Sequence, residues 1–418
     1  MRVSGTITVP GDKSISHRAL ILSSLASGES RIRGILDSAD VRSTAGVLRA
    51  LGASVPSLSA DMSVKGRGVR GLTQPRVSLG CGNSGTTARL MAGVVAGHPI
   101  SASFDGDASL SRRPMRRIAE PLTSMGARIE LARGDGLPMT IHGGKLRSVG
   151  WDTGGSSAQV KSAILLAALV SEVEVRVTER TPSRDHTERM LRAMGVRVET
   201  DGAKVWFRPA PKLDPVDAIV PGDPSSAAFF LALASLADTG SLALPNVCIN
   251  PTRSGFIDAM RRMGADIETH DCAMSGGEET ATLTVRPASF SDGKVTAKEV
   301  PSLIDELPLL ACVAAGAGVE LEVSGASELR VKESDRIAVV VRNLNAVGAR
   351  AEERPDGLRV FGGKTRLRGS VDPQGDHRIA MAFGVLSRCA GNDITITDSE
   401  CVSVSYPDFW KDLDRVAA

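Results

Sequence analysis

Six apolar runs of helical length recur along the chain at nearly equal intervals. Each run follows a few small or polar residues, and a run of this length predicts a helix. The polar starts lie 70, 73, 68, 80 and 72 residues apart, at Ser14, Ser84, Ser157, Ser225, Asp305 and His377. A steady period of this kind indicates structural repeats, so we predict six repeats of about seventy residues each.

A β-branched, alternating stretch follows each apolar run and predicts a strand. These stretches are Glu29–Leu36, Pro99–Asp105, Glu172–Thr178, Gly240–Pro245, Gly318–Val323 and Asn392–Thr397. In five repeats a glycine further on predicts the left-handed end of a second helix, at Gly52, Gly126, Gly195, Gly264 and Gly348. The sixth repeat has no such glycine. The opening stretch Thr6–Val9 has no helix before it, so we expect this strand to complete the sixth repeat.

This closure predicts an α/β protein of two domains with three repeats each. The first domain would comprise residues 11–221, and the second residues 1–10 together with 222–418. The turn-forming pairs Pro10-Gly11 and Pro221-Gly222 would then be hinges where the chain crosses between domains. The alternative is two independent sequential domains. Unchanged thermal stability of the C-terminal half after deletion of residues 1–10 would support that alternative.

Composition narrows the class of protein. The 418 residues are 42% apolar and 23% charged, with 50 Lys and Arg against 48 Asp and Glu, which is typical of a globular protein. The charge balance argues against a strongly basic nucleic-acid binder. Aromatic residues make up only 3%, which leaves little material for base stacking. We therefore expect no nucleic-acid partner.

The sequence also bears on location and on metals. The apolar runs 163–170 and 227–237 are shorter than the roughly 18–20 residues that cross a bilayer, and Met1 leads into no secretory or transit segment. We expect a cytoplasmic protein without a membrane span. Six scattered cysteines contain no close pair, which favours reduced, mostly buried thiols over a zinc site or a disulfide framework.

Basic residues gather at the predicted helix starts. Lys13, Ser14 and Arg18 lie together, and the last two share one helical face. A helix N-terminus with two cations and a hydroxyl suits a phosphate or a carboxylate, whereas the alternative is a solvated basic face. At Ser225 and Ser226 we favour a plain helix cap without a ligand.

Equivalent loops of other repeats repeatedly supply cations. They include Arg112, Arg113, Arg184, Lys332, Arg336 and Arg378. A nearly neutral protein that concentrates cations in this way is predicted to bind one or two multiply anionic small molecules between its halves. Asp305, Glu306 and Glu333 beside these cations are acid/base candidates, with helix capping and ion pairing as the alternative. His17, His186 and His377 are too far apart in sequence to argue for a metal site.

Several of these motifs, in order along essentially the whole chain, resemble the 5-enolpyruvylshikimate-3-phosphate (EPSP) synthase family. They are Val9–Arg18, Gly82–Thr86, Ser111–Pro114, Ser157–Gln159, Leu329–Arg336 and Gly375–Arg378. The resemblance implies a two-domain inside-out α/β barrel, with helices inside, sheets outside and the N-terminal strand in the C-terminal domain. It also implies that no metal or organic cofactor is needed. We expect a monomer.

The implied reaction transfers the enolpyruvyl group of phosphoenolpyruvate to the 5-hydroxyl of shikimate 3-phosphate and releases phosphate. By resemblance, shikimate 3-phosphate would be held by Lys13, Ser14, Arg18, Ser157, Gln159, Arg184, Asp305 and Lys332. Phosphoenolpyruvate would be held by Lys13, Asn83, Gly85, Arg113, Gln159, Arg336, His377 and Arg378. The implied catalytic residues are Asp305 as the base for the 5-hydroxyl, Glu333 as the acid for the methylene carbon, and Lys13.

Three positions depart from the family pattern, namely Val404 for a Lys, Ala158 for a Ser and Leu90 for a Pro. Val404 removes one expected contact to phosphoenolpyruvate. Two alternatives are weighed against the synthase. The enolpyruvyl transferase acting on UDP-N-acetylglucosamine usually carries a reactive Cys in the loop that is residues 106–114 here, and this loop has none. A non-catalytic anion-binding protein on the same scaffold would bind shikimate 3-phosphate without turnover.

Overall fold

The computed structural model of the chain describes residues 1–363 and 366–417. These residues divide into two compact units. The N-terminal unit comprises Gly11–Val220 and the short segment Met274–Glu278. The C-terminal unit comprises Met1–Pro10, Pro221–Ala273 and the described residues from Glu279 onward. The sequence pattern gives no sign of the segment 274–278, because a hairpin tip carries no periodic signal of its own.

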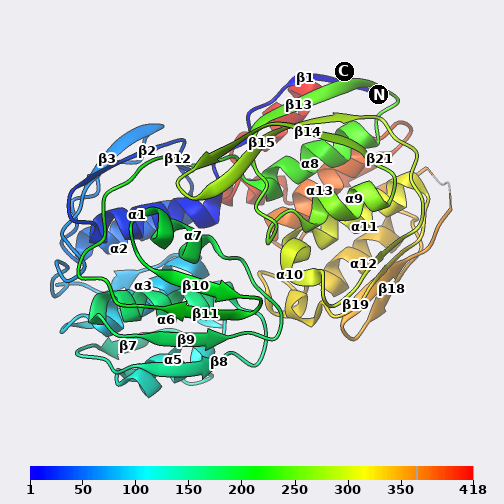
Figure 1. Cartoon of the computed structure of the whole chain (residues 1–418). Helices are drawn as coiled ribbons and strands as arrows, with labels where there is room; N and C mark the ends of the chain where they lie inside the picture. The colour runs from blue at the N-terminus through cyan, green and yellow to red at the C-terminus, as the bar shows by residue number, and fades with distance from the viewer. Residues whose placement is uncertain (364–365, 418) are drawn as a thin grey trace. The chain divides into compact units, whose positions relative to one another are not determined.

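Six inner helices form the centres of the two units (Figure 1), and each begins within two residues of its predicted start. In the N-terminal unit they are α1 (Lys13–Leu25), α3 (Gly85–Gly97) and α6 (Ala158–Ser171). In the C-terminal unit they are α8 (Pro224–Ser235), α11 (Leu307–Ala317) and α13 (His377–Arg388). Almost all of their residues are buried, because a helix that is apolar on every side must be covered on every side.

Helices α3 and α6 pack at very short range, and two glycines permit it. A Cβ atom at Gly93 would lie 2.1 Å from the carbonyl oxygen of Ala163. One at Gly97 would lie 2.8 Å from the Cβ of Val170. The short distance between these two helix axes therefore requires glycine, which has no side chain, at both positions.

Small sheets surround the inner helices of the N-terminal unit. The first has the order β12-β2-β3, with β12 (Asp217–Ile219), β2 (Glu29–Arg33) and β3 (Asp61–Lys65). The second has the order β4-β5-β7-β6, with β4 (Leu79–Gly80), β5 (Ser101–Asp105), β6 (Arg128–Leu131) and β7 (Met139–His142). The third has the order β8-β9-β11-β10, with β8 (Val149–Asp152), β9 (Val175–Thr178), β10 (Val198–Asp201) and β11 (Lys204–Phe207).

The C-terminal unit repeats this plan with three more sheets. One has the order β1-β13-β15-β14, with β1 (Arg2–Thr6), β13 (Thr239–Cys248), β14 (Asp266–Ser275) and β15 (Glu278–Arg286). Another has the order β16-β17-β19-β18, with β16 (Gly293–Val295), β17 (Leu321–Val323), β18 (Ala351–Arg354) and β19 (Gly357–Val360). The last pairs β20 (Arg368–Val371) with β21 (Asp393–Ile396). Strands such as β3 and β5 alternate buried and exposed residues, so one face of the sheet covers the core.

The outer helices complete the repeats. The longer ones are α2 (Ala39–Ala50), α5 (Arg116–Met125), α7 (His186–Ala193), α9 (Gly255–Arg262), α12 (Arg336–Ala346) and α14 (Phe409–Val416), and α4 (Ala108–Ser111) is a single turn. The five glycines predicted to end helices all have positive φ angles, from 86° to 117°. The predicted fold class, with helices inside and strands outside, is confirmed.

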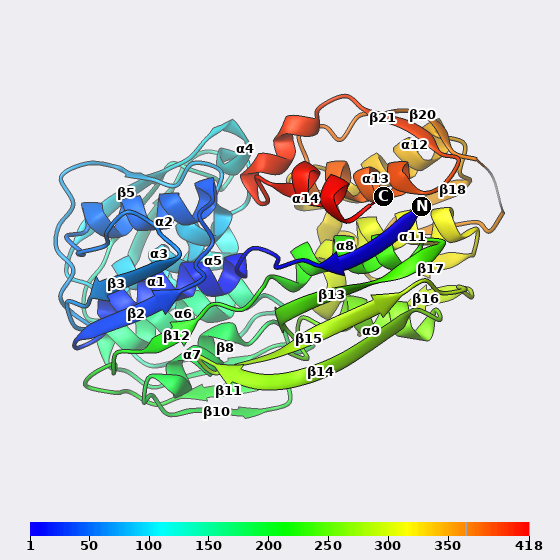
Figure 2. The ribbon, with the colours of Figure 1, turned by 90° about the horizontal axis from the view of Figure 1, so that it is seen from above.

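The expectation for the opening strand is wrong. The strand is β1 (Arg2–Thr6), not Thr6–Val9, and it pairs in parallel with β13 of the fourth repeat, Arg2 opposite Thr239. Figure 2 shows β1 lying along β13. In the other sheets the strand before an inner helix pairs with the strand after it, as β8 and β9 do around α6. Where the chain passes from one unit to the other, β1 and β12 exchange partners. β12 precedes α8 yet pairs with β2, and β1 precedes α1 yet pairs with β13.

One segment of the described chain, Val300–Ala317, is long and apolar enough to cross a membrane by length and composition alone. Within its unit 67% of this segment is buried. It consists of α10 (Val300–Leu303), the 3₁₀ turn η1 (Ile304–Glu306) and α11. Asp305 and Glu306 in the turn interrupt the apolar run, which is why the sequence pattern indicates only shorter runs.

Candidate active site

The start of α1 carries the first group of predicted ligand residues. Asp12 caps the helix by accepting from the Ile15 N–H at 2.8 Å. The Lys13 Nζ lies 3.1 Å from an Asp40 carboxylate oxygen. Arg18 is only 4% exposed, and its guanidinium donates to Thr187, Ser162 and the Ser14 carbonyl at 2.7–3.0 Å. This burial rules out the solvated basic face.

Burial also affects the charge of Arg18. Desolvation lowers the pKa of its guanidinium to about 10, although Glu188 and Asp12 act in the opposite direction. The side chain therefore remains a cation at neutral pH. Because its donors reach α6 and α7, the position of this cation depends on three helices at once.

The loop before α3 brings Asn83, Gly85 and Arg113 together. The Arg113 guanidinium donates to the Asn83 side-chain oxygen at 2.6 Å, and the Asn83 amide donates to Asp107 at 2.6 Å. A Cβ at Gly85 would lie 3.5 Å from Arg113 Nη1 and 2.8 Å from Arg89 Nη1. Two guanidinium groups thus lie beside the first residue of a helix, where N–H donors also favour an anion.

Gln159 joins this group through Arg89. Arg89 Nη1 donates to the Gln159 side-chain oxygen at 2.8 Å, and the Gln159 amide donates to Thr86 at 3.2 Å. Arg89 is not among the predicted site residues, although it lies four residues after Gly85 and so shares that face of the helix. Ser157 caps α6, and Arg184 lies in the loop before α7.

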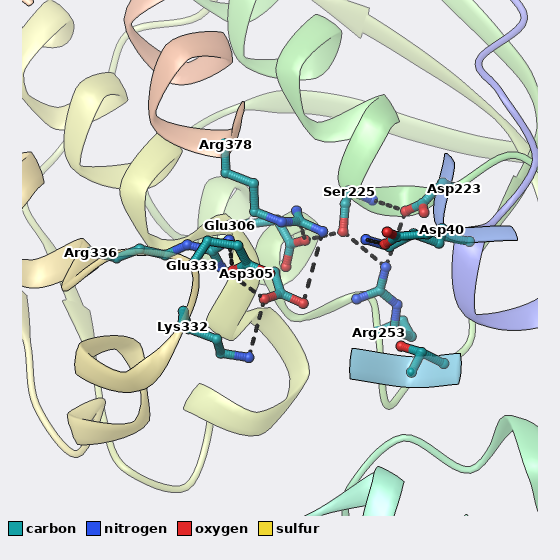
Figure 3. Close-up of polar contacts among 12 residues, drawn as sticks. Asp40, Asp223, Ser225, Arg253, Asp305, Glu306, Lys332, Glu333, Arg336 and Arg378 are labelled. Atoms are coloured by element: carbon teal, nitrogen blue, oxygen red, sulfur yellow. Dashed lines mark hydrogen bonds and ion pairs between the residues drawn. The ribbon is translucent and has the colours of Figure 1, made fainter. Parts of the chain in front are cut away.

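In the C-terminal unit, Asp305 lies among three cations (Figure 3). One of its oxygens is 3.2 Å from Arg336 Nη1 and 3.5 Å from Lys332 Nζ, and the other is 3.9 Å from Arg378 Nη2. The Asp305 side chain is 11% exposed. The predicted residues Asp305, Lys332, Arg336 and Arg378 are therefore together, although 73 residues separate the first and last.

Arg336 is the most constrained cation of this group. Its side chain is 1% exposed, and it binds Asp376 at 2.8 Å and Glu333 at 2.7 Å as well as Asp305. Burial alone would lower the pKa of Arg336, but the three carboxylates outweigh it and raise the pKa above its usual value. The guanidinium is therefore permanently charged and fixed in orientation.

Asp376 contacts the predicted residue Arg336, although it is not itself among the predicted site residues. It caps α13 by accepting from the Arg378 N–H at 3.0 Å, and it also accepts from Ser334 at 3.0 Å. Burial raises the pKa of its carboxyl, but Arg336 and His377 bring it below the usual value. His377 opens α13 and is 3% exposed. Asp376 directly precedes the predicted residue His377, and this position in the sequence could have identified it.

A second layer lies behind Arg378. Glu306 is 3.5 Å from Arg378 Nη1 and accepts a hydrogen bond from the Ser225 hydroxyl, while Arg253 donates to Ser225 at 2.9 Å (Figure 3). The expectation that Ser225 is a plain helix cap is wrong. Asp223 caps α8 by accepting from the Ser225 N–H at 2.7 Å, which leaves the serine hydroxyl to orient Glu306.

The three departures from the family pattern lie in ordered elements. Val404 ends the 3₁₀ turn η3 (Ser399–Val404) and is half-buried, Ala158 opens α6, and Leu90 is buried in α3. The six cysteines are free thiols, and Cys81, Cys248 and Cys312 are buried. Residues 1–363 and 366–417 contain no group of three or more His, Cys, Asp or Glu side chains arranged to hold a metal ion.

The chain shares its fold with a solved enolpyruvyl transferase. The crystal structure of the enolpyruvyl transferase NikO from Streptomyces tendae aligns with a TM-score of 0.75 over 99% of this chain and 95% of that one. Its sequence identity of 18% shows the shared fold alone. The sequence model of the EPSP synthase (3-phosphoshikimate 1-carboxyvinyltransferase) family matches residues 1–413.

Full-length relatives agree with that match. A 3-phosphoshikimate 1-carboxyvinyltransferase from Sulfurihydrogenibium sp. (strain YO3AOP1) is 46% identical over 423 residues, covering 100% of this chain and 98% of the relative. An EPSP synthase structure from Acinetobacter baumannii has a TM-score of 0.89 and 39% identity, covering 100% and 96% of the two chains. The chain belongs to the EPSP synthase family. It is thus an enzyme of the shikimate pathway that transfers an enolpyruvyl group to shikimate 3-phosphate, and neither alternative is favoured.

Proposed function

We propose that Asp305 and Glu333 perform the proton transfers of this reaction by addition and elimination. In the addition, Asp305 takes the proton of the 5-hydroxyl, and the hydroxyl oxygen bonds to the central carbon of phosphoenolpyruvate. Glu333 gives a proton to the methylene carbon, which becomes a methyl group. The resulting tetrahedral intermediate still carries the phosphate. In the elimination the carbon–oxygen bond to phosphate breaks, a methyl proton returns to Glu333, and the proton held by Asp305 leaves with the phosphate.

The observation that carries this assignment is the position of Asp305 within 4 Å of Lys332, Arg336 and Arg378. The two substrates bring two phosphates and a carboxylate, and their mutual repulsion opposes the approach of oxygen to carbon. Fixed cations offset that repulsion without reorganising during the reaction. Arg336 suits this task because Glu333 and Asp376 hold it before any ligand binds.

Ligand assignments for the two substrates form part of the same proposal. Shikimate 3-phosphate would bind Lys13, Ser14, Arg18, Ser157, Gln159, Arg184, Asp305 and Lys332. Phosphoenolpyruvate would bind Lys13, Asn83, Gly85, Arg113, Gln159, Arg336, His377 and Arg378. Support comes from the α3 start, where Arg113, Asn83 and Gly85 already form one group.

The organisation and surroundings of the enzyme are also proposed. The chain would act as a cytoplasmic monomer without a metal, an organic cofactor or a membrane, and Pro10-Gly11 and Pro221-Gly222 would be its hinges. Support for paired hinge segments is the hydrogen bond from the Asp223 N–H to the Pro10 carbonyl at 2.8 Å. Light scattering of the purified protein and assays with a chelator would test the monomer and the absence of a metal.

Replacement of Asp305 tests the catalytic assignment. We expect Asp305→Ala to lower kcat by about 100-fold or more, because a general base typically contributes at least that factor. Phosphate release would be measured with both substrates, and with each substrate omitted in turn. Shikimate 3-phosphate binding by the variant would be measured by calorimetry to separate turnover from affinity. Turnover near that of the unmodified enzyme would remove Asp305 from the mechanism.

A further inference from the structure

A buried ion pair in the N-terminal unit lies directly behind two ligand loops. We call residues 153–157, which precede α6, the first loop, and residues 180–185, which precede α7, the second loop. Lys161 on α6 and Glu179 at the end of β9 form the pair at 2.8 Å. Their side chains are 2% and 1% exposed, and neither residue is among those proposed to bind a substrate.

The Glu179 carboxylate binds the main chain of both loops. One oxygen accepts from the Ser157 N–H at 2.9 Å, and the other accepts from the Ser183 N–H at 3.1 Å. Lys161 Nζ donates to the Ser183 carbonyl at 3.3 Å. The pair therefore holds Ser183 at both its N–H and its carbonyl, and it holds Ser157 at its N–H.

We propose that Glu179 and Lys161 are positioning residues that set the spacing of the shikimate 3-phosphate ligands Ser157 and Arg184. The inference rests on the proposed function, which assigns those two residues to that substrate. Ser157 is bound directly by the pair, and Arg184 follows Ser183 in the chain. A misplacement of about 1 Å in such ligands can cost on the order of 100-fold in rate or affinity.

Holding the main chain of two loops explains why this buried pair is charged. A carboxylate offers two acceptor oxygens, which lets one side chain accept from two N–H groups and an ammonium at once. Burial tends to lower the pKa of Lys161, but Glu188 at 2.9 Å and Glu179 raise it, so the ammonium stays charged. Apolar residues could fill the same space at less cost in desolvation, but they could not hold either loop.

The loops have further ties that do not involve buried charge. The Ser156 hydroxyl in the first loop donates to the Thr181 carbonyl in the second at 2.7 Å. The Arg180 N–H donates to the Gly155 carbonyl at 3.1 Å. Ser156→Ala therefore weakens the same spacing mildly and leaves the ion pair intact.

Glu179→Gln is the decisive variant because glutamine has a single carbonyl oxygen. In either orientation its NH₂ group would face a donor, and one loop would lose its acceptor. We expect the KM and the Kd for shikimate 3-phosphate to rise about tenfold, with kcat changed less than about threefold. Glu188→Gln is the matched control, because Glu188 is equally buried and binds Lys161 but neither loop. Glu188 also raises the pKa of Arg18, but because Arg18 remains a cation at neutral pH, the KM of this variant for shikimate 3-phosphate should stay within about twofold.

The outcomes separate this inference from the proposed function. Arg184→Ala is measured alongside, and an unchanged Kd for shikimate 3-phosphate in that variant would refute the ligand assignment itself. A raised Kd in Arg184→Ala with an unchanged Kd in Glu179→Gln would overturn the positioning role. An equal rise of KM in Glu188→Gln would also overturn it, because the effect would then be general destabilisation. If Glu179→Gln does not fold, Glu179→Asp decides, because the shorter side chain keeps the charge but cannot reach the N–H groups of Ser157 and Ser183 at once, and we expect its Kd to rise about threefold at an unchanged melting temperature. An unchanged Kd there would overturn the inference.

Discussion

Gly85 occupies the first position of α3 and has two guanidinium groups against its Cα. The Arg89 side chain that a Cβ would displace is buried and holds Gln159 at 2.8 Å. Arg113, the other neighbour, is held by Asn83. At this position one hydrogen atom in place of a methyl group sets the orientation of two cations and an amide.

We therefore expect Gly85→Ala to raise the KM for phosphoenolpyruvate by about tenfold, because the guanidinium groups that would bind it must move. The melting temperature should hardly change, since the Cβ meets the end of a flexible side chain and not the backbone. Steady-state kinetics with each substrate varied would measure the effect. An unchanged KM for phosphoenolpyruvate would show that the position tolerates a methyl group.

A second residue-scale prediction concerns His17, which is fully buried and hydrogen-bonded to Thr44 at 2.7 Å. Desolvation lowers the pKa of its imidazole to about 3 from 6.5, and Lys13 and Arg18 add to this while Asp40 opposes it. The unfolded chain then binds more protons than the folded one between these pH values, so stability falls as the pH drops below about 6.5. At pH 5 the loss from this group is about 2 kcal/mol relative to pH 8.

His17→Asn should flatten that dependence, because asparagine can keep a hydrogen bond to Thr44 but does not titrate. Urea denaturation at pH 5 and pH 8 would measure the free energy of unfolding for both proteins. The difference between the two pH values, compared across the proteins, isolates the contribution of His17. Equal differences would contradict a neutral buried histidine.

Helices α3 and α6 set the geometry of the N-terminal unit at the scale of elements. Their starts carry Gly85, Ser157 and Gln159, and their spacing follows from the close contact at Gly93. A wider spacing would separate the groups proposed to bind the two substrates. Packing in the interior of the unit and ligand geometry at its helix starts are therefore coupled.

Gly93→Ala should destabilise the protein by about 1–3 kcal/mol, because the new Cβ would lie 2.1 Å from the Ala163 carbonyl, which is backbone and cannot rotate away. Gly46→Ala on α2 is the matched control. No atom lies within 4 Å of a Cβ there, and alanine is the better helix former by about 1 kcal/mol. Thermal denaturation should show opposite signs for the two variants. Two changes of the same sign would contradict the packing argument.

The sequence predicts these elements to very different degrees. Inner helices such as α8 and α11 are predictable because a helix in the core is apolar throughout its length. Lys13, Asp305 and Arg336 are predictable because their motifs place charge at helix starts. Glu179 and Arg253 are not, since Lys161 and Ser225, which they contact, lie 18 and 28 residues away in sequence and only the fold brings them near.

Strand partners are the least predictable feature of the whole molecule. Alternation in a sequence marks a strand but says nothing of its neighbour, so the pairing of β1 with β13 could not be derived from residues 1–10. Because β1 pairs with β13 and β12 pairs with β2, each unit contains a strand that directly adjoins the other unit in the sequence. Val3 of β1 and Ile7, which directly follows β1, are buried in the C-terminal unit.

Deletion of residues 1–6 should therefore destabilise the C-terminal unit, because β13 would lose its parallel partner and Val3 its buried site. Burial of one such side chain contributes about 1.5–3 kcal/mol, which corresponds to a fall of about 3–12 °C in the Tm of a unit of this size. Hydrogen exchange should increase in β13 and stay unchanged in β9, which serves as the internal reference. An unchanged Tm would support two sequential domains instead.

The same exchange has a consequence for biosynthesis. β1 leaves the ribosome before its partner, which begins only at Thr239. At about 5–20 residues per second, β1 waits on the order of 10–50 s as an unpaired edge on a nascent chain. Its short length and its polar residues Arg2, Ser4 and Thr6 limit its pairing with other nascent chains during that interval. The N-terminal unit gains β12 earlier and can finish most of its folding while the C-terminal unit is still being translated.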